Sequence, residues 1–224
     1  MSLLRIDASI RHEGSASRAL ADLAESHWLD AAPDARVVHR EVGTTPLPSD
    51  AWAHALRAGA IPDDDRTPEQ RDAAALAATL VDELAEADAY LFAVPLYNFG
   101  VSQHLKTYVD LVIADARMSP AVPPVTAGRP GLLVTVQGGN YAAGTPKEGW
   151  DHATGWLRRI LEDVWQIDLE VVNREFTLVG VNPALDGFTD LAEQIRTTAE
   201  DRARSAGRRL AERPVATAHE PHRV

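Results

Sequence analysis

Cysteine is entirely absent from this chain of 224 residues. The chain can therefore form no disulfide, no thiolate metal site and no cysteine nucleophile, and we expect an intracellular, cytoplasmic protein. No apolar run reaches the roughly 18 residues that a membrane span requires. The first residues also lack the basic-then-apolar pattern of a secretion signal. We expect no membrane partner.

Positive charge is also scarce, because the formal net charge is -11 at pH 7. This balance opposes electrostatic attraction to nucleic acid and to anionic lipid. The arginines near the C-terminus alternate with acidic residues, a pattern typical of a solvated helix face. They are Arg202, Arg204, Arg208, Arg209 and Arg213, interleaved with Glu200, Asp201 and Glu212. We expect no nucleic-acid partner.

Several familiar enzyme motifs are missing as well. There is no G-x-S-x-G of a serine hydrolase, no G-x-G-x-x-G of a dinucleotide fold and no G-x-x-x-x-G-K-[ST] of a triphosphate loop. The histidines are scattered along the chain and do not predict a metal site. Those that precede the last ten residues are His12, His27, His39, His54, His104 and His152.

What is present is an alternation of strand-like and helix-like segments. Apolar runs predict strands at residues 3–7, 35–42, 89–94 and 131–136, and a last strand made of 169–173 together with 176–179. Helical spacing predicts helices at 19–29, 52–57, 67–86, 101–113 and 151–164, and a long one within 186–213. This order predicts one α/β domain over residues 1–213, a doubly wound five-stranded parallel sheet with helices on both faces. Residues 214–224 are predicted to be a flexible tail.

Three loops follow strand ends and therefore meet at one edge of the predicted sheet. Residues 9–17 offer hydroxyl groups and a helix start, with Ser15 or Ser17 as N-cap, which suits a phosphate. Residues 95–100 contribute a proline, two aromatic rings, an amide side chain and a glycine, and residues 137–141 contain two glycines. Each loop also has a purely structural interpretation. Residues 9–17 are then a serine-rich loop with an ordinary helix cap, residues 95–100 a turn packed in the core, and the two glycines simply part of a flexible loop. Taken together, they describe a site for flavin mononucleotide (FMN).

In these loops the chain resembles the FMN-dependent NADH:quinone oxidoreductase and azoreductase family, over roughly residues 3–178. The resemblance is carried by Ser9 and Ser15-Ala16-Ser17, by Pro95-Leu96-Tyr97-Asn98-Phe99 followed by Gln103, Leu105, Lys106, Tyr108, Asp110 and Leu111, and by Gly138-Gly139. It implies a flavodoxin-like fold and a homodimer with active sites at the subunit interface. It also implies ping-pong transfer of two electrons from NADH or NADPH, through FMN, to a quinone or azo compound.

The resemblance also assigns roles to residues. Ser9, Ser15, Ala16 and Ser17 would bind the phosphate, and Leu96, Tyr97, Asn98, Phe99, Gln137, Gly138, Gly139 and Asn140 would hold the isoalloxazine ring. Main-chain amides or Asn98 near one ring edge would stabilise the charge of the reduced flavin. No catalytic acid or base is assigned, because hydride transfer requires none.

The segment after the helix predicted at 101–113 departs from the family, because it lacks the aromatic residues that help to form the substrate mouth. Tyr141 or Trp150 is a candidate replacement. Two other functions stay open on this fold: a non-catalytic flavin electron carrier or flavin-binding regulator, and a specialised biosynthetic quinone reductase.

Overall fold

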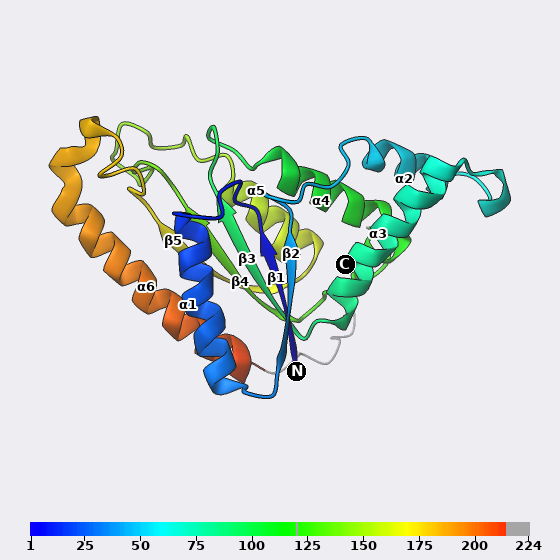
Figure 1. Cartoon of the computed structure of the whole chain (residues 1–224), viewed down its shortest axis with the longest axis horizontal. Helices are drawn as coiled ribbons and strands as arrows, with labels where there is room; N and C mark the ends of the chain where they lie inside the picture. Colours follow the sequence, from blue (N-terminus) through cyan, green and yellow to red (C-terminus); the bar gives the residue numbers. More distant parts are fainter. Residues whose placement is uncertain (120, 214–224) are drawn as a thin grey trace, which may run out of the picture.

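Five parallel strands form the central sheet, in the order β2-β1-β3-β4-β5 (Figure 1). The structure is a computed structural model that describes residues 1–119 and 121–213. The strands are β1 (Ser2–Asp7), β2 (Arg36–Glu41), β3 (Ala89–Pro95), β4 (Pro130–Val136) and β5 (Asp168–Arg174). The helices are α1 (Ala16–Ala31), α2 (Ala51–Gly59), α3 (Pro68–Glu86), α4 (Gln103–Ala114), α5 (Thr154–Arg158) and α6 (Thr189–Glu212). The predicted fold class is confirmed.

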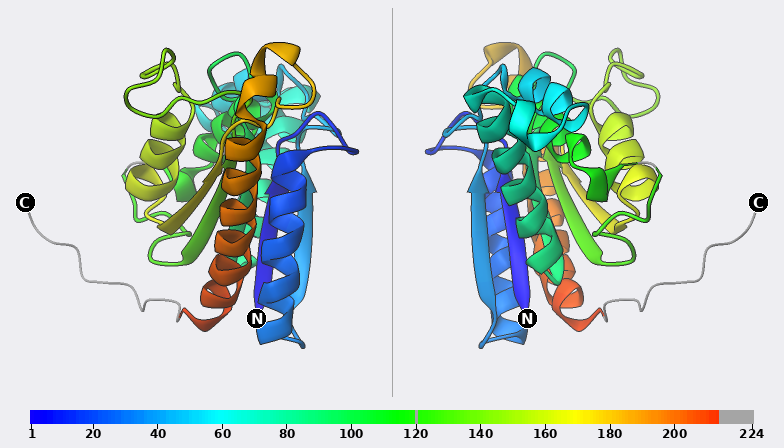
Figure 2. Two further views of the ribbon diagram at one scale, coloured as in Figure 1. Left: turned by 90° about the vertical axis from the view of Figure 1, so that its left-hand side faces the viewer. Right: turned by 90° about the vertical axis from the view of Figure 1, so that its right-hand side faces the viewer.

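Helices cover both faces of this sheet. Helices α1 and α6 pack together on one face, and α3, α4 and α5 lie on the other, with α2 packed on α3 and α4 (Figures 1 and 2). Leu4 and Ile6 of β1 point towards α3 and α4, whereas Leu3 points towards α1. Because both faces are covered, every residue of β3 and β4 is buried, which explains their continuous apolar runs.

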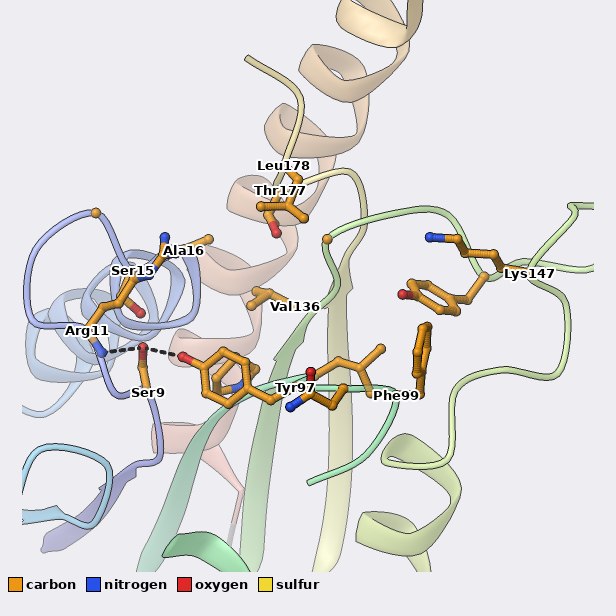
Figure 3. A pocket seen from close by; sticks show the side chains of 16 residues that line it. Ser9, Arg11, Ser15, Ala16, Tyr97, Phe99, Val136, Lys147, Thr177 and Leu178 are labelled. Atoms are coloured by element: carbon orange, nitrogen blue, oxygen red, sulfur yellow. Dashed lines mark hydrogen bonds between the residues drawn. The ribbon is translucent and has the colours of Figure 1, made fainter. Parts of the chain in front are cut away.

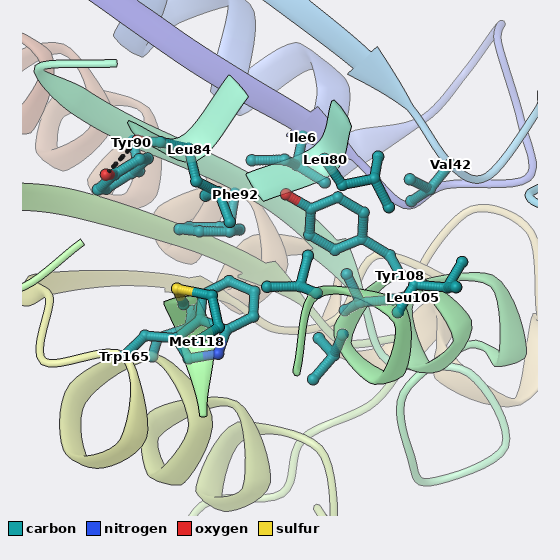
Figure 4. Close-up of a cluster of buried hydrophobic side chains, with 14 of the residues drawn as sticks. Ile6, Val42, Leu80, Leu84, Tyr90, Phe92, Leu105, Tyr108, Met118 and Trp165 are labelled. Carbon is teal, nitrogen blue, oxygen red and sulfur yellow. Dashed lines mark hydrogen bonds between the residues drawn. The ribbon is translucent and has the colours of Figure 1, made fainter. Parts of the chain in front are cut away.

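The larger side of the core contains a group of buried aromatic rings (Figure 4). Phe92 and Tyr108 lie 6.4 and 6.3 Å from Trp165, centroid to centroid. The Tyr90 hydroxyl donates to the carbonyl of Leu84 at 2.8 Å, and burial raises the pKa of Tyr90 to about 12. This packing anchors β3 and α4, the two elements that flank the loop at residues 96–102.

Local sequence signals explain where two helices begin. Thr67 and Gln70 form a reciprocal capping box at the start of α3, with Pro68 in the first turn. Of the two candidate caps for α1, the structure uses Ser15, whose side chain accepts a hydrogen bond from the Arg18 amide. Helix α1 therefore starts three residues earlier than its apolar pattern alone predicted.

Two predicted elements were wrong in detail. Residues 176–179 do not continue the last strand, because β5 ends at Arg174 and the chain turns at Phe176, where φ is 56°. Strand β4 already ends at Val136, so residues beyond Arg174 have no ladder partner. The helix predicted at 151–164 is a short α5 followed by a π-helical turn, Arg159–Val164. The tail predicted at 214–224 lies outside the described residues.

Candidate functional site

A cavity of about 430 Å³ opens at the carboxyl edge of the sheet, where the loops after β1, β3, β4 and β5 meet (Figure 3). It is lined by Ser9, Arg11, Gly14, Ser15, Ala16, Pro95, Leu96, Tyr97, Asn98, Phe99, Val136, Gly138, Tyr141, Lys147, Thr177 and Leu178. The three loops that the sequence placed at one edge are thus brought together. The lining contains two cations, Arg11 and Lys147, and no carboxylate.

One end of the cavity is the N-terminus of α1. The first amides of a helix have no intrahelical partner, and the helix dipole makes this position favourable for an anion. The Ser15 hydroxyl satisfies the Arg18 amide and lies 3.2 Å from the Ser17 hydroxyl. The amides of Ala16 and Ser17, together with the Ser9 and Ser15 side chains, therefore form an end suited to a phosphate.

Arg18 supports this anion-binding loop from behind. Its guanidinium donates to the carbonyls of Ser9 and Arg11 at 3.1 and 2.9 Å. It also makes a two-pronged ion pair with Glu41, with N–O distances of 2.5 and 2.6 Å. Asp7 lies 3.6 Å from the same guanidinium and is fully buried. The loop after β1 is thus tied to the end of β2 by charge-assisted hydrogen bonds.

Gly43 provides a second support. A Cβ at this position would lie 2.2 Å from the carbonyl oxygen of Ser9. The backbone after β2 therefore runs directly against the loop after β1, and only glycine permits this approach. The Gly43 amide donates to the carbonyl of Asp7 at 3.1 Å, which holds the two chain segments in register.

The loop after β3 is a tight hairpin. Tyr97 and Gly100 exchange two backbone hydrogen bonds of 3.0 and 2.9 Å around the central residues Asn98 and Phe99. Those central residues have φ angles of 48° and 66°, as a type I′ turn requires. Asparagine tolerates this conformation, whereas phenylalanine adopts it at a cost of about 1–3 kcal/mol. Phe99 has 41% of its surface exposed, so it is not a core residue.

Tyr97 connects this hairpin to the anion-binding loop (Figure 3). The hydroxyl groups of Tyr97 and Ser9 share a hydrogen bond of 3.2 Å, and the Ile10 amide donates to the Tyr97 hydroxyl at 3.3 Å. The Arg11 amide donates to Ser9 Oγ at 3.2 Å. The phosphate end and the aromatic end of the cavity are therefore linked by one chain of hydrogen bonds.

Three aromatic rings form the rim of the cavity at the hairpin. Phe99 makes edge-on contacts with Tyr141 and Trp150, at centroid distances of 6.4 and 5.3 Å. The His152 amide donates to the Phe99 carbonyl at 2.9 Å and fixes the hairpin against this loop. Tyr141 and Trp150, the two candidates to replace the aromatic residues that this chain lacks at the substrate mouth, thus both contact Phe99. Tyr141 also lines the cavity. We call Phe99, Tyr141 and Trp150 the aromatic rim.

The segment after β5 holds the diglycine loop in place. The amides of Phe176, Thr177 and Leu178 donate to the carbonyls of Gly139, Gln137 and Gly138, respectively, at 3.0–3.2 Å. A Cβ on Gly138 would lie 2.7 Å from Leu178 Cδ1, so this glycine is required by packing. The residues misassigned to a strand are therefore the clamp that shapes the third loop.

Four of the residues predicted to bind FMN are not among those that line the cavity. Ser17 is fully buried, and the Gln137 side chain is buried and donates to Asp151 at 2.6 Å. The Gly139 carbonyl is occupied by Phe176, and the Asn140 side chain accepts from the Ala142 amide at 2.9 Å. The other eight, Ser9, Ser15, Ala16, Leu96, Tyr97, Asn98, Phe99 and Gly138, line the cavity.

Sequence reasoning did not identify Arg11, Lys147, Thr177 and Leu178 as part of the site. Arg11 lies within the serine-rich loop, so its position was an available signal. Lys147 belongs to a loop whose path the sequence does not specify, and the last two were assigned to a strand. Across residues 1–119 and 121–213, no group of three or more His, Asp or Glu side chains could hold a metal ion. The same residues include no helix long and apolar enough to cross a membrane.

Comparisons with known proteins agree with this arrangement. A family model described as flavodoxin-like fold matches residues 1–199. The FMN-dependent NADH:quinone oxidoreductase of Frankia alni is 41% identical over 92% of this chain and 99% of its own length. That of Parafrankia sp. is 40% identical over 90% and 96%. The crystal structure of an azoreductase from Bacillus anthracis superposes with a TM-score of 0.77 over 93% of this chain and 99% of that one. At 23% sequence identity, this likeness supports the fold alone. The chain belongs to the flavodoxin-like family of FMN-dependent NADH:quinone oxidoreductases.

Proposed function

We propose that this protein is an FMN-dependent oxidoreductase that uses NADH or NADPH to reduce quinones or azo compounds by two electrons in a ping-pong cycle. The observation that carries the proposal is the single cavity in which the N-terminus of α1, the strained aromatic hairpin and the diglycine loop converge. The Frankia alni and Parafrankia relatives, aligned over nearly the whole chain, bear the name of this activity.

The residues of the cavity fit FMN in both charge and shape. A phosphate requires amides, hydroxyls and no carboxylate at its end, and the lining provides Ser9, Ser15 and Ala16 beside the cationic Arg11. A flat ring requires close backbone approach and apolar walls, which the hairpin, Leu96, Val136 and Gly138 supply. The 430 Å³ volume lies within the ordinary range for a small-molecule site.

FMN, when bound, supplies the two-electron carrier that takes a hydride from the nicotinamide and passes it to the acceptor. The work left to the chain is to bind, to orient and to stabilise charge. Backbone amides of the hairpin and diglycine loop, and the Asn98 amide, would donate to the polar edge of the ring. For a quinone the overall balance is one hydride from NADH and one proton from water, so no protein acid or base is required.

The proposal also includes a homodimer and a cytoplasmic location. Phe99 and Trp150 of the aromatic rim are 41% and 49% exposed. Val181, Phe188 and Leu191, which follow residues 176–178 in the sequence, are exposed as well. Exposed apolar groups of this kind are what a subunit interface at the site mouth would cover. Sedimentation velocity at several protein concentrations tests the dimer, and cell fractionation tests the location.

The phosphate end is tested by a charge placed at Ser15. In Ser15→Asp and Ser15→Asn the new side chain can still cap α1, because both residues are good N-caps, and the two variants differ only in charge. An anion about 4 Å from a phosphate is repelled by about 4 kcal/mol at an effective dielectric constant of 20. We expect Ser15→Asp to lose FMN affinity by at least about a hundredfold relative to Ser15→Asn.

The measurement is FMN binding by fluorescence quenching, with circular dichroism to establish that both variants are folded. Equal FMN affinity in the two variants would contradict the phosphate assignment. Oxidation of NADH in the presence of benzoquinone or an azo dye distinguishes the enzyme from a flavin carrier or flavin-binding regulator. A protein that binds FMN and leaves both NADH and NADPH unoxidised would be a carrier or a regulator.

A further inference from the structure

Lys147 is a cation at the end of the cavity opposite the anion-binding loop. Figure 3 shows Lys147 and Phe99 on one side, and Ser9, Arg11 and Ser15 on the other. The Lys147 ammonium lies 5.6 Å from the centre of the Tyr141 ring, within reach of a cation–π interaction. A Cβ placed on Gly139 would be 3.5 Å from the same ammonium, so it stands directly over the diglycine loop.

Lys147 has no acidic partner within the described part of the chain, because no carboxylate oxygen there lies within 4.0 Å of its ammonium. The only other lysine, Lys106, is paired with Asp110 at 2.5 Å on the outer side of α4. Glu175 and Glu148 lie in the same region, because they accept hydrogen bonds from the amides of Tyr141 and Gly144. Neither carboxylate lines the cavity, however, so Lys147 is the charged side chain that the cavity presents at this end.

The surroundings of Lys147 face solvent rather than the interior. Phe99 and Trp150 are 41% and 49% exposed, and Lys147 itself lies in an exposed loop. The phosphate of the cofactor is already served by the α1 end, at the far side of the cavity. A ligand that meets both the aromatic rim and Lys147 is therefore one that enters from solvent. In a ping-pong cycle the nicotinamide and the electron acceptor both enter in this way, and kcat/KM for the acceptor reports the second of them.

We propose that Lys147 is a specificity-determining residue that selects flat aromatic acceptors carrying an anionic group, such as a sulfonate or a carboxylate. The aromatic rim would receive the ring system, and the ammonium would pair with the acid group beside Tyr141. This inference rests on the proposed function and narrows its substrate class. It assigns no proton transfer to Lys147.

The test compares acceptors that differ in charge. The ratio of kcat/KM for naphthoquinone sulfonate to kcat/KM for naphthoquinone is measured in the wild type, Lys147→Gln, Lys147→Arg and Lys106→Gln. The intrinsic reactivity of the two quinones cancels when the ratio is compared between variants. We expect Lys147→Gln to lower the ratio by about five- to tenfold, Lys147→Arg to restore most of it, and Lys106→Gln to leave it unchanged.

Equilibrium binding gives a readout that is independent of turnover. Naphthalene-2-sulfonate and its neutral sulfonamide have nearly the same shape and cannot accept a hydride, and their affinity for the oxidised, FMN-loaded protein is measured by dialysis. The wild type should bind the sulfonate more tightly, and this preference should disappear in Lys147→Gln. It should also weaken as salt concentration rises, because an exposed ion pair is screened.

Other outcomes overturn the inference. An equal ratio of kcat/KM for the charged and neutral quinones in the wild type and Lys147→Gln would show that this lysine does not select the acceptor by its charge. A lower FMN reduction potential in Lys147→Gln, with kcat/KM for charged and neutral acceptors changed by the same factor, would place the lysine on the cofactor instead. Both results are compatible with the proposed function, whereas a wild type that oxidises neither NADH nor NADPH with these quinones, with benzoquinone or with an azo dye would refute the proposed function itself.

Discussion

Replacing Arg18 by methionine tests whether the anion-binding loop depends on its buried support. Methionine keeps most of the apolar stem and removes the guanidinium. The change deletes the hydrogen bonds to the carbonyls of Ser9 and Arg11 and the ion pair with Glu41. It also leaves Asp7, which is 1% exposed, without one of its two nearby arginines.

The loss of stability follows from burial. Breaking a fully buried ion pair costs about 3–5 kcal/mol, and an exposed pair contributes about 0–1 kcal/mol. The Arg18 side chain is 10% exposed and the Glu41 side chain 29%, which places this pair between the two limits. We expect a loss of about 2–3 kcal/mol, or about 4–12 °C in Tm for a chain of this length.

The effect on FMN binding is indirect, because Arg18 does not line the cavity. Hydrogen bonds to a charged group contribute about 1.5–3 kcal/mol each, and binding would have to order a loop that has lost this support. We expect FMN to bind about 10- to 100-fold more weakly. The assays are thermal unfolding of the FMN-free protein and FMN titration at a temperature where it is folded.

Arg209→Met is the matched control, because its ion pair with Glu170 is exposed on the outer surface. Its Tm and its FMN affinity should stay close to those of the wild type. If Arg18→Met behaves like Arg209→Met in both measurements, the supporting role of Arg18 is refuted. A lower Tm with unchanged FMN affinity would refute only the link to the loop.

The remaining predictions concern the pH dependence of the same pair and two backbone positions. The Arg18 hydrogen bond lowers the pKa of Glu41, so its contribution is complete above the ordinary glutamate pKa of about 4.3 and is lost as the pH falls below it. The difference in unfolding free energy between wild type and Glu41→Gln should shrink in that range; a constant difference would contradict the assignment. Gly43→Ala should weaken FMN binding by more than about tenfold, because its Cβ would lie 2.2 Å from the Ser9 carbonyl oxygen, whereas Gly155→Ala, with open space around it, should not. Phe99→Gly should relieve φ strain and raise stability by up to about 1 kcal/mol in urea unfolding while it raises the KM for acceptors; unchanged kinetics would exclude Phe99 from the rim.

Local patterns in the sequence were sufficient for the fold class. The apolar run that became β3 is long enough for one buried strand, and Thr67 with Gln70 marks the start of α3 without reference to any distant residue. Each of these signals involves residues within a single helical turn or a single strand. The interactions that form the element are therefore local, and the sequence of that segment alone predicts it. The edge on which the three loops meet also followed, because parallel strands place all their carboxyl ends together.

Only the tertiary structure decided which side chains face the cavity. Gln137 was predicted to hold the ring; its side chain is buried and donates to Asp151, and it does not line the cavity. Thr177 and Leu178 were predicted to lie in a strand. Because β4 ends at Val136, they have no partner in the sheet, and their amides instead hydrogen-bond to the diglycine loop. Lys147 reaches the site through a loop whose path depends on contacts with Phe99. Such positions are set by hydrogen bonds and packing between segments far apart in the chain, and these interactions leave no periodic signal in the sequence.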